Sequence, residues 1–207
     1  MAGWRVHTGQ AVALARANVD TDQLIPARFM SVPRVQGYGD YLLHDVRRTE
    51  AGDVRNDFSL NNAPNASVLI AGPNFGSGSS REAAVYALVD AGVRAVFAPS
   101  FGDIFASNAI NNGLLPARID LAIYETLVSQ LAEGTCEAKV DLENKTATIG
   151  RETFAFALDE TWRTKLMNGW DDIDLTQQHA GEIALFKKNY TQITPWVAPE
   201  DIVESTL

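Results

Sequence analysis

The amino-acid sequence predicts an α/β domain with parallel strands at its centre. Three observations support this prediction. Between residues 66 and 119, short apolar runs alternate with segments that have the pattern of helices. The run at residues 66–71 leads through a glycine-rich loop into a helical segment. With 207 residues, 46% of them hydrophobic, the chain is also long and apolar enough to bury a core of its own.

The expected elements follow one another in a simple order. A short strand is predicted first, and three strand–helix pairs follow, of which the first contains the glycine-rich loop. The predicted strands span residues 10–15, 66–71, 94–98 and 114–119, and the helices between them span 82–89 and 103–111. A helix from Leu121 to Leu131, ended by Gly134, comes next. Alternating residues then predict strands at 137–141, 146–149 and 153–157, with a hairpin turn at Asn144-Lys145, and a last helix at 175–190.

Two segments lack such a pattern. Residues 26–64 mix prolines, glycines and charges without a period of 2 or 3.6, so we expect a long irregular excursion. Residues 195–207 are acidic and show no pattern that would pair them, so we expect a loosely held tail. The predicted organisation is therefore a single domain over residues 1–194, followed by this tail.

Charge and cysteine content exclude several classes of function. Seventeen Lys and Arg against 26 Asp and Glu give a net charge of −9, which disfavours nucleic acids and anionic membrane surfaces as partners. The single cysteine, Cys136, supplies neither an internal disulfide nor the ligand set of a metal site. No apolar segment has the length of a membrane span, and the first residues lack the pattern of a signal peptide. We therefore expect a cytoplasmic chain with no metal of its own.

The most informative motif is the loop Gly76-Ser77-Gly78-Ser79-Ser80-Arg81 between a predicted strand and a predicted helix. A helix N-terminus presents free N–H groups and partial positive charge, and glycines let an anion approach the backbone. Arg81 can hold a carboxylate through two parallel hydrogen bonds. The loop therefore predicts a site for a carboxylate or phosphate. A purely structural alternative stays open, in which Ser79 or Ser80 caps the helix and the glycines only turn the chain.

Three familiar motifs do not fit this loop. A P-loop requires a lysine at its end, and none is near. The dinucleotide-binding fingerprint requires a third glycine where Arg81 stands. The nucleophile elbow requires a glycine two residues after its serine, and neither Ser77 nor Ser79 has one. A nucleotide-binding enzyme would therefore rest on the glycines alone.

Five motifs, in order along the chain, resemble the small-subunit family of 3-isopropylmalate dehydratases in the aconitase superfamily. The motifs are residues 18–26 (NVDTDQLIP), 74–82 (NFGSGSSRE), 100–105 (SFGDIF), 112–116 (NGLLP) and 174–179 (DLTQQH). The resemblance implies the swivelling β/β/α domain of that superfamily, with a mixed sheet and flanking helices. It also implies a separate large subunit, in a heterodimer or heterotetramer, that carries a 4Fe–4S iron–sulfur cluster.

The resemblance further implies a hydro-lyase reaction. The two chains would interconvert 2-isopropylmalate and 3-isopropylmalate through isopropylmaleate, in leucine biosynthesis, with a small dicarboxylate as substrate. Ser79 matches the serine that acts as the base beside a carboxylate. Ser80 and Arg81, with the backbone at Gly76 and Gly78, would bind a substrate carboxylate.

Further residues take expected roles by position. Asp20, Thr21 and Asp22 match a second family signature, where we expect a role in ordering the loop, although an Asx turn explains each of them equally well. Arg28 and Arg34 are further candidate carboxylate ligands, with a solvated surface position as the alternative.

Substrate discrimination is expected at the family's variable loop, which corresponds here to the segment that contains Tyr38, Tyr41 and Leu42. This chain departs from the family at Ala83, where a histidine is usual. The departure keeps two alternatives open. One is the small subunit of a paralogous hydro-lyase for another malate-like or maleate-like diacid, and the other is a non-catalytic module that binds a partner.

Overall fold

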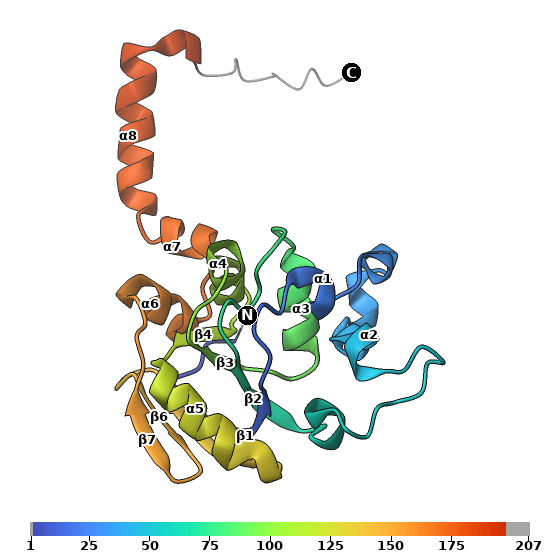
Figure 1. The fold of residues 1–207 in the computed structure, drawn as a ribbon. Coiled ribbons are helices and arrows are strands. Elements are labelled where there is room, and N and C mark those ends of the chain that lie inside the picture. Colours follow the sequence, from blue (N-terminus) through green and yellow to red (C-terminus); the bar gives the residue numbers. More distant parts are fainter. Residues whose placement is uncertain (1, 198–207) are drawn as a thin grey trace. The chain divides into compact units, whose positions relative to one another are not determined.

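A computed structural model describes residues 2–197 of the chain. These residues form two compact units that divide after Asp171. The first unit contains one sheet and the helices around it (Figure 1). The second unit contains two helices. Among the described residues, no helix has both the length and the apolar character needed to cross a membrane.

The sheet of the first unit has seven strands in the order β4-β3-β2-β1-β5-β6-β7. The strands are β1 (Val6–Leu14), β2 (Ala66–Ala71), β3 (Ala95–Ala98), β4 (Leu115–Arg118), β5 (Cys136–Asp141), β6 (Thr146–Ile149) and β7 (Glu152–Ala155). The first four strands pair in parallel, and β5, β6 and β7 continue the sheet as antiparallel neighbours. The predicted α/β class with a mixed sheet is confirmed.

Strand β1 is the seam between the two halves. It pairs in parallel with β2, where Val12 lies opposite Leu69, and antiparallel with β5, where His7 lies opposite Val140. The strand begins at Val6, four residues before the predicted start. Its first residues are largely exposed and polar, so they lack the apolar run by which a buried strand is recognised.

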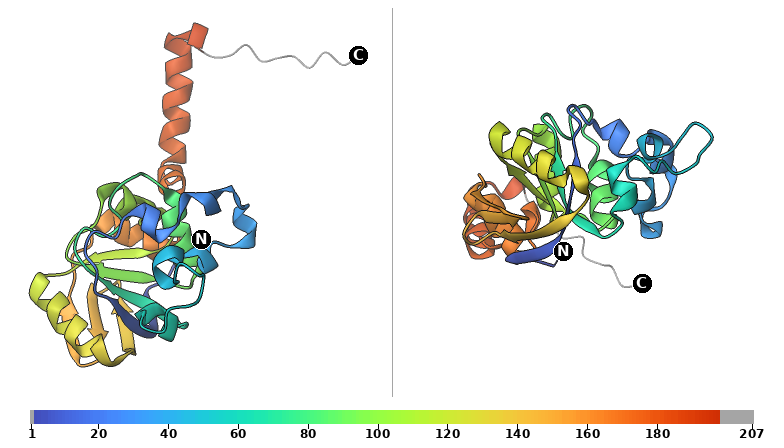
Figure 2. Two further views of the ribbon diagram at one scale, coloured as in Figure 1. Left: turned by 45° about the vertical axis from the view of Figure 1, so that its right-hand side comes forward. Right: turned by 60° about the horizontal axis from the view of Figure 1, so that its bottom comes forward.

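The helices of the first unit are α1 (Thr21–Leu24), α2 (His44–Arg47), α3 (Glu82–Asp90), α4 (Asp103–Asn111), α5 (Leu121–Gln130) and α6 (Glu160–Asn168). Side chains of alternate strand residues enter two separate core clusters, one on each face of the sheet. Helix α3 and the segment around Leu42 and Leu60 pack on one face. Helices α5 and α6 pack on the other, through Leu127 and Leu166. Figure 2 shows the helices distributed over the two faces.

The predicted irregular excursion is confirmed between β1 and β2. It contains only one-turn elements: α1, α2, and the 3-10 turns Ala27–Ser31, Arg34–Gln36, Gly39–Tyr41 and Ser59–Asn62. The excursion is nevertheless ordered by burial, because Leu24, Ile25, Leu42 and Leu43 are fully buried in the core. The hairpin at Asn144-Lys145 is also confirmed, with the Asp141 carboxylate accepting a hydrogen bond from the Asn144 N–H at 3.0 Å.

The helices differ from the prediction in two places. Helix α6 was not predicted, although Asp159 caps its N-terminus by accepting hydrogen bonds from the Thr161 and Trp162 N–H groups. The buried residues of this helix are Lys165 and Leu166, so its sequence is too polar to show an apolar face. The single helix expected at 175–190 is instead two helices, α7 (Asp172–Gln177) and α8 (Ala180–Ile193), which make up most of the second unit.

The expected single domain over residues 1–194 stays a prediction. Of the expected C-terminal tail, Pro195–Val197 form a 3-10 turn, and the remainder lies outside the described residues. The helix predicted to end at Gly134 ends at Gln130, and a 3-10 turn (Leu131–Glu133) leads into that glycine.

Phe97 joins the two halves of the sheet and gives a prediction for stability. Its ring on β3 makes edge-on contacts with Phe154 on β7, at 5.7 Å between centroids, and with Phe156, at 5.6 Å. Phe97→Ala is expected to lower the free energy of unfolding by about 3–5 kcal/mol, because it leaves a cavity between these rings. Ile104→Ala, at a largely exposed position on α4, is the control and should change it by less than about 0.5 kcal/mol in urea titrations. Equal effects would contradict this account of the core.

Candidate functional site

The candidate site is built from three loops that follow parallel strands. The loops span residues 15–20 after β1, 72–81 after β2 and 99–102 after β3. Parallel strands bring their carboxyl ends to the same edge of a sheet, which is where α/β proteins commonly bind ligands. The short helix α1 follows the first loop and contacts α3, which follows the second (Figure 1).

Backbone hydrogen bonds join the first loop to the second. The Gly76 N–H donates to the Val19 carbonyl at 2.7 Å, and the Thr21 N–H donates to the Ser77 carbonyl at 3.0 Å. The Asn18 N–H donates to the Pro73 carbonyl at 2.9 Å. These bonds extend the pairing of β1 and β2 beyond the sheet, so the two family signatures form one structural unit.

Two asparagines reinforce this junction. The Asn74 side-chain amide donates to the Asn18 side-chain oxygen at 2.8 Å. Both residues have left-handed backbone conformations, with φ of 60° and 55°, which asparagine tolerates better than most residues. The third loop joins through Ser100, whose hydroxyl accepts a hydrogen bond from the Asn74 N–H at 2.8 Å.

The loop after β2 rests on an aromatic cluster that the sequence did not reveal. Phe75 is completely buried and contacts Phe105 edge-on, with ring centroids 5.4 Å apart. Gly76 lies directly on the Phe105 ring, since a Cβ at this position would stand 2.2 Å from Cγ of Phe105. Its φ of +71° is also one that side chains disfavour. Gly76 therefore serves close packing as well as the turn.

Ser79 and Ser80 are exposed, and neither caps the helix that follows. The N-cap of α3 is Arg81, without a side-chain capping bond, so the capping alternative for Ser79 and Ser80 is wrong. Thr21, which is buried, donates its hydroxyl hydrogen to the Ser79 carbonyl at 3.0 Å. This bond holds the backbone of Ser79 from behind while its side chain remains on the surface.

Arg81 forms an ion pair with Asp22. The pair connects the loop after β2 to α1, and it means that a ligand carboxylate at Arg81 must compete with Asp22 or share the guanidinium with it. Asp20 has a different task, because its carboxylate caps α1 by accepting a hydrogen bond from the Gln23 N–H at 2.7 Å. The structure thus brings Asp20, Thr21 and Asp22 together with residues 76–81.

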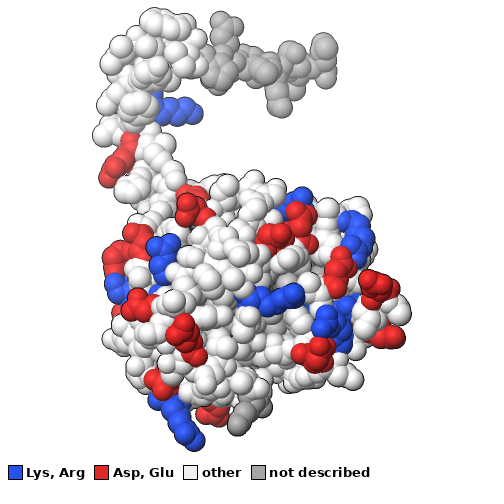
Figure 3. Space-filling view, viewed as in Figure 1, with Lys and Arg blue, Asp and Glu red and all other residues white. Residues whose placement is uncertain are grey.

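The other two candidate arginines have partners elsewhere. Arg28 donates to both carboxylate oxygens of Asp45, and this contact, followed by one from His44, lowers the pKa of Asp45 to about 2. Arg34 donates to Asp90 at 3.3 Å, and its guanidinium lies 3.3 Å above the ring of Tyr86. On the face of the protein seen in Figure 3, Lys and Arg side chains are interspersed with Asp and Glu side chains.

The segment expected to discriminate between substrates is anchored to the C-terminal end of α3. Asp90 accepts a hydrogen bond from the Tyr38 N–H at 2.9 Å in addition to its contact with Arg34. Tyr38 and Leu42 are buried, and the Tyr38 hydroxyl donates to the Val32 carbonyl at 2.8 Å. Tyr41 is half-buried and stacks on Phe29 at 4.3 Å. Tyr38 and Leu42 therefore hold the backbone of this segment in place by packing in the core.

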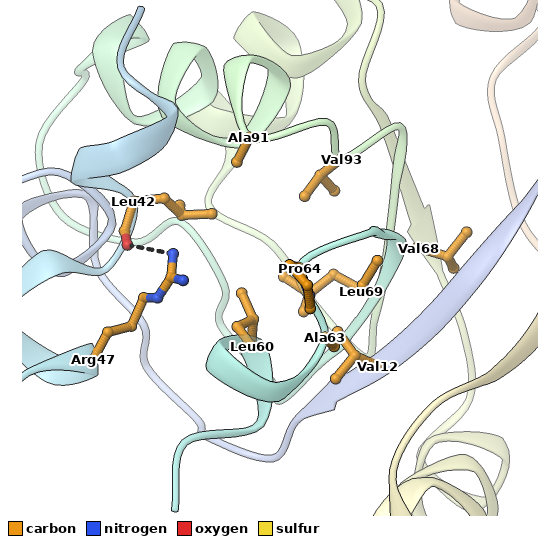
Figure 4. Close-up of a pocket in the computed structure, with 11 residues that line it drawn as sticks. Val12, Leu42, Arg47, Leu60, Ala63, Pro64, Val68, Leu69, Ala91 and Val93 are labelled. Carbon is orange, nitrogen blue, oxygen red and sulfur yellow. Dashed lines mark hydrogen bonds between the residues drawn. The ribbon is translucent and has the colours of Figure 1, made fainter. Parts of the chain in front are cut away.

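A small cavity lies beneath this segment, between Leu42, Leu60 and Leu69 (Figure 4). Arg47 borders it and donates to the Leu42 carbonyl at 3.4 Å. The cavity has a volume of about 50 Å³, which is enough for a few water molecules but not for a dicarboxylate of the predicted size. The cavity is therefore a packing feature and not the candidate site.

Ala83 lies inside the protein, 8% exposed, in the core cluster on the inner side of α3. The departure from the family at this position therefore changes the packing of the helix and does not remove a side chain from the exposed surface of the loop.

The described residues do not fit an iron–sulfur cluster or another metal centre. They contain no group of three or more His, Cys, Asp or Glu side chains arranged to hold a metal ion. Cys136 is half-buried on β5, where it accepts a hydrogen bond from Gln130 at 3.6 Å, and burial raises the pKa of its thiol. A raised thiol pKa disfavours the thiolate that a cluster requires.

Comparison with known proteins assigns the family. Residues 1–122 match the model of the aconitase C-terminal domain. The 3-isopropylmalate dehydratase small subunit of Shewanella baltica is 46% identical over 202 residues, covering 95% of this chain and 99% of that protein. The chain belongs to the small-subunit family of 3-isopropylmalate dehydratases. The family resemblance inferred from the sequence is therefore confirmed.

One further relative agrees with this assignment, and one solved structure shares the fold. The small subunit of Salinispora arenicola is 43% identical over 198 residues, covering 95% of this chain and 100% of its own length. A crystal structure of 3-isopropylmalate dehydratase from Methanocaldococcus jannaschii has the same fold, with a TM-score of 0.60 at 24% identity. That match covers 88% of this chain and 99% of the other. A family of small subunits implies a large subunit as partner.

The contact between Gly76 and Phe105 gives a second prediction. Gly76→Ala combines an unfavourable φ with a clash, whereas Gly92→Ala, with φ of +91° and nothing within 4 Å, has the unfavourable φ alone. Gly92→Ala is expected to lower the free energy of unfolding by about 1–2 kcal/mol. Gly76→Ala should exceed it by a further 1–3 kcal/mol or so, the usual cost of overpacking a core. Chemical denaturation measures both, and equal losses would show that Phe105 moves aside freely.

The hydrogen bond from Thr21 to Ser79 gives a third prediction. Thr21→Val keeps the shape of the side chain but leaves the Ser79 carbonyl without this donor, so we expect a loss of about 1–3 kcal/mol of stability. Thr126→Val is the matched control, because its hydroxyl makes the same type of bond at 2.9 Å on the exposed face of α5. Amide hydrogen exchange of residues 77–81 should accelerate only in Thr21→Val. Unchanged exchange there would contradict the role given to Thr21.

Proposed function

We propose that this chain acts as the small subunit of a 3-isopropylmalate dehydratase. With its large subunit it would interconvert 2-isopropylmalate and 3-isopropylmalate through isopropylmaleate in leucine biosynthesis. The observation that carries the proposal is the exposed Ser79 next to Arg81, on a loop fixed by the two neighbouring loops, in a chain with this family membership.

The reaction removes and adds water beside a carboxylate, and two tasks fall to this chain. The first is to bind the carboxylate. Arg81 offers two parallel donors, and the Ser80 hydroxyl adds another. Gly78 is exposed and has φ of +93°, so the backbone there is open to a ligand. Gly76 would act by turning the loop, because its N–H is donated to the Val19 carbonyl. Asp22 would keep Arg81 oriented until the substrate takes part of its hydrogen bonds.

The second task is to move a proton. We assign the base to Ser79, which would take the proton from the carbon next to the bound carboxylate. A serine hydroxyl is a very weak base in water, so its oxyanion requires nearby positive charge and N–H donors. Arg81 provides the charge, and the N-terminus of α3, which has no side-chain cap, provides the donors.

The large subunit completes the enzyme in this proposal. We place the iron–sulfur cluster there because the described residues of this chain do not fit it. When bound, the cluster supplies a Lewis acid for the departing hydroxyl group. Whether the subunits form a heterodimer or a heterotetramer, and the cytoplasmic location, stay predictions.

The segment around residues 37–43 would face the isopropyl group. In this proposal Tyr38, Tyr41 and Leu42 set the position of its backbone. Arg28 and Arg34 could contact the substrate only if Asp45 and Asp90 release them.

Replacing the proposed base is the central test. Ser79→Ala, co-expressed with the large subunit from the same genome and reconstituted without oxygen, should turn over isopropylmaleate at least about a hundredfold more slowly, as is usual for loss of a proton-transfer group. Ser129→Ala, at an exposed serine on α5, is the control and should leave turnover unchanged. Full activity of Ser79→Ala in an intact complex would support the non-catalytic alternative. Activity only on other maleate-like diacids in the same assay would support the paralogous hydro-lyase.

Lysine substitutions can show which arginine binds the substrate carboxylate. Arg81→Lys keeps the charge but loses the paired donors, so kcat/KM should fall by about tenfold to a hundredfold, the worth of one or two charge-assisted hydrogen bonds. Arg28→Lys should lower it by less than about threefold, because Arg28 is engaged by Asp45 and the pair is exposed. A larger effect at Arg28 than at Arg81 would place the substrate carboxylate beside α2 instead.

A further inference from the structure

A separate cavity of about 330 Å³ lies between the start of α4, the end of β4 and the segment that leads into α6. Figure 1 shows these three elements close to one another in the first unit. The volume falls within the range of small-molecule binding sites. No step of the proposed reaction uses this cavity.

The walls of the cavity are mainly apolar. The lining includes the buried residues Phe101, Pro116 and Leu158 and the half-buried Trp162. Such a lining favours an aliphatic or aromatic group that leaves water.

Three charged residues also line it, and their partners differ. Asp159 already accepts hydrogen bonds from the Thr161 and Trp162 N–H groups as the cap of α6. Arg118 and Asp103 are exposed, and neither has an ion pair or a side-chain hydrogen bond within the part of the chain that the structure describes. The cavity thus combines an apolar lining with one available cation, Arg118, and one available anion, Asp103.

The position of the cavity suits ligand binding. Phe101 follows β3 and Arg118 ends β4, so both lie at the carboxyl edge of the parallel strands. Phe101 is also bridged to Phe75, and the Gly102 N–H donates to the Phe75 carbonyl at 2.9 Å. A ligand in this cavity would therefore contact a residue that is directly joined to the loop of Ser79 and Arg81.

From this combination we propose that the cavity binds a small carboxylic acid with an apolar group, and that it prefers the zwitterion of an apolar α-amino acid. The carboxylate pairs with Arg118, the ammonium group with Asp103, and the apolar side chain lies against Trp162 and Leu158. Each charged group of such a ligand is then paired with an opposite charge, and its apolar side chain with apolar side chains. This proposal does not depend on the reaction assigned to Ser79.

Calorimetric titration of the full chain with three probes that share an isobutyl group tests the proposal. L-Leucine carries both charges, 4-methylpentanoate lacks the ammonium group, and 3-methylbutylamine lacks the carboxylate. We expect saturable binding of leucine with a Kd of about 1 mM or tighter. Each missing charge should weaken binding by about tenfold, the usual worth of a charge-assisted hydrogen bond.

Variants locate the binding. Arg118→Gln should weaken leucine binding by about tenfold or more, and Asp103→Asn should bring leucine to the affinity of 4-methylpentanoate. Ala157→Leu, at an exposed position on the cavity rim, should block binding without unfolding the protein. Arg5→Gln is the control, because Arg5 pairs with Glu143 and does not line the cavity. Absence of saturable binding in the wild type, or binding by Arg118→Gln and Ala157→Leu that is as tight as in the wild type, would overturn the proposal.

Discussion

The candidate site depends on how closely the loop after β2 approaches its neighbours. Gly76 sits against the ring of Phe105 on one side and donates its N–H to the loop after β1 on the other. A side chain at this position would clash with the Phe105 ring. Because the loop is fixed at Gly76, the residues that follow it emerge at a defined place, with Ser79 exposed and Arg81 beside Asp22.

Local sequence was sufficient to predict most of the sheet. Strands β2 and β3 are short apolar runs buried on both faces, and such runs are visible without knowledge of the fold. The start of β1 was missed because its order comes from pairing with β5, more than 120 residues further along the chain. Helix α6 was missed because tertiary contacts at Lys165 and Leu166, and not an apolar stripe, define its buried face.

The site was predictable in its residues but not in its support. The glycines and Arg81 of the loop 76–81 predict an anion site by themselves, and the resemblance adds the role of Ser79 and the signature at 20–22. Hydrogen bonds in the structure join the two segments. The partners of Arg28 and Arg34 could not be foreseen, because each contact spans an irregular segment. The aromatic cluster under Gly76 consists of Phe75, Phe101 and Phe105. It could not be predicted either, since these phenylalanines look like ordinary core residues in the sequence.

The place of β1 at the centre of the sheet has a consequence for how the chain folds. This strand is made first, yet one of its edges is covered by β2 and the other by β5, which is made last among its neighbours. Until residues 136–141 have been synthesised, an unpaired strand edge remains exposed on the growing chain. Contacts of such long sequence separation fold slowly. The nascent protein therefore passes through a period of vulnerability to aggregation that ends only when the antiparallel half arrives.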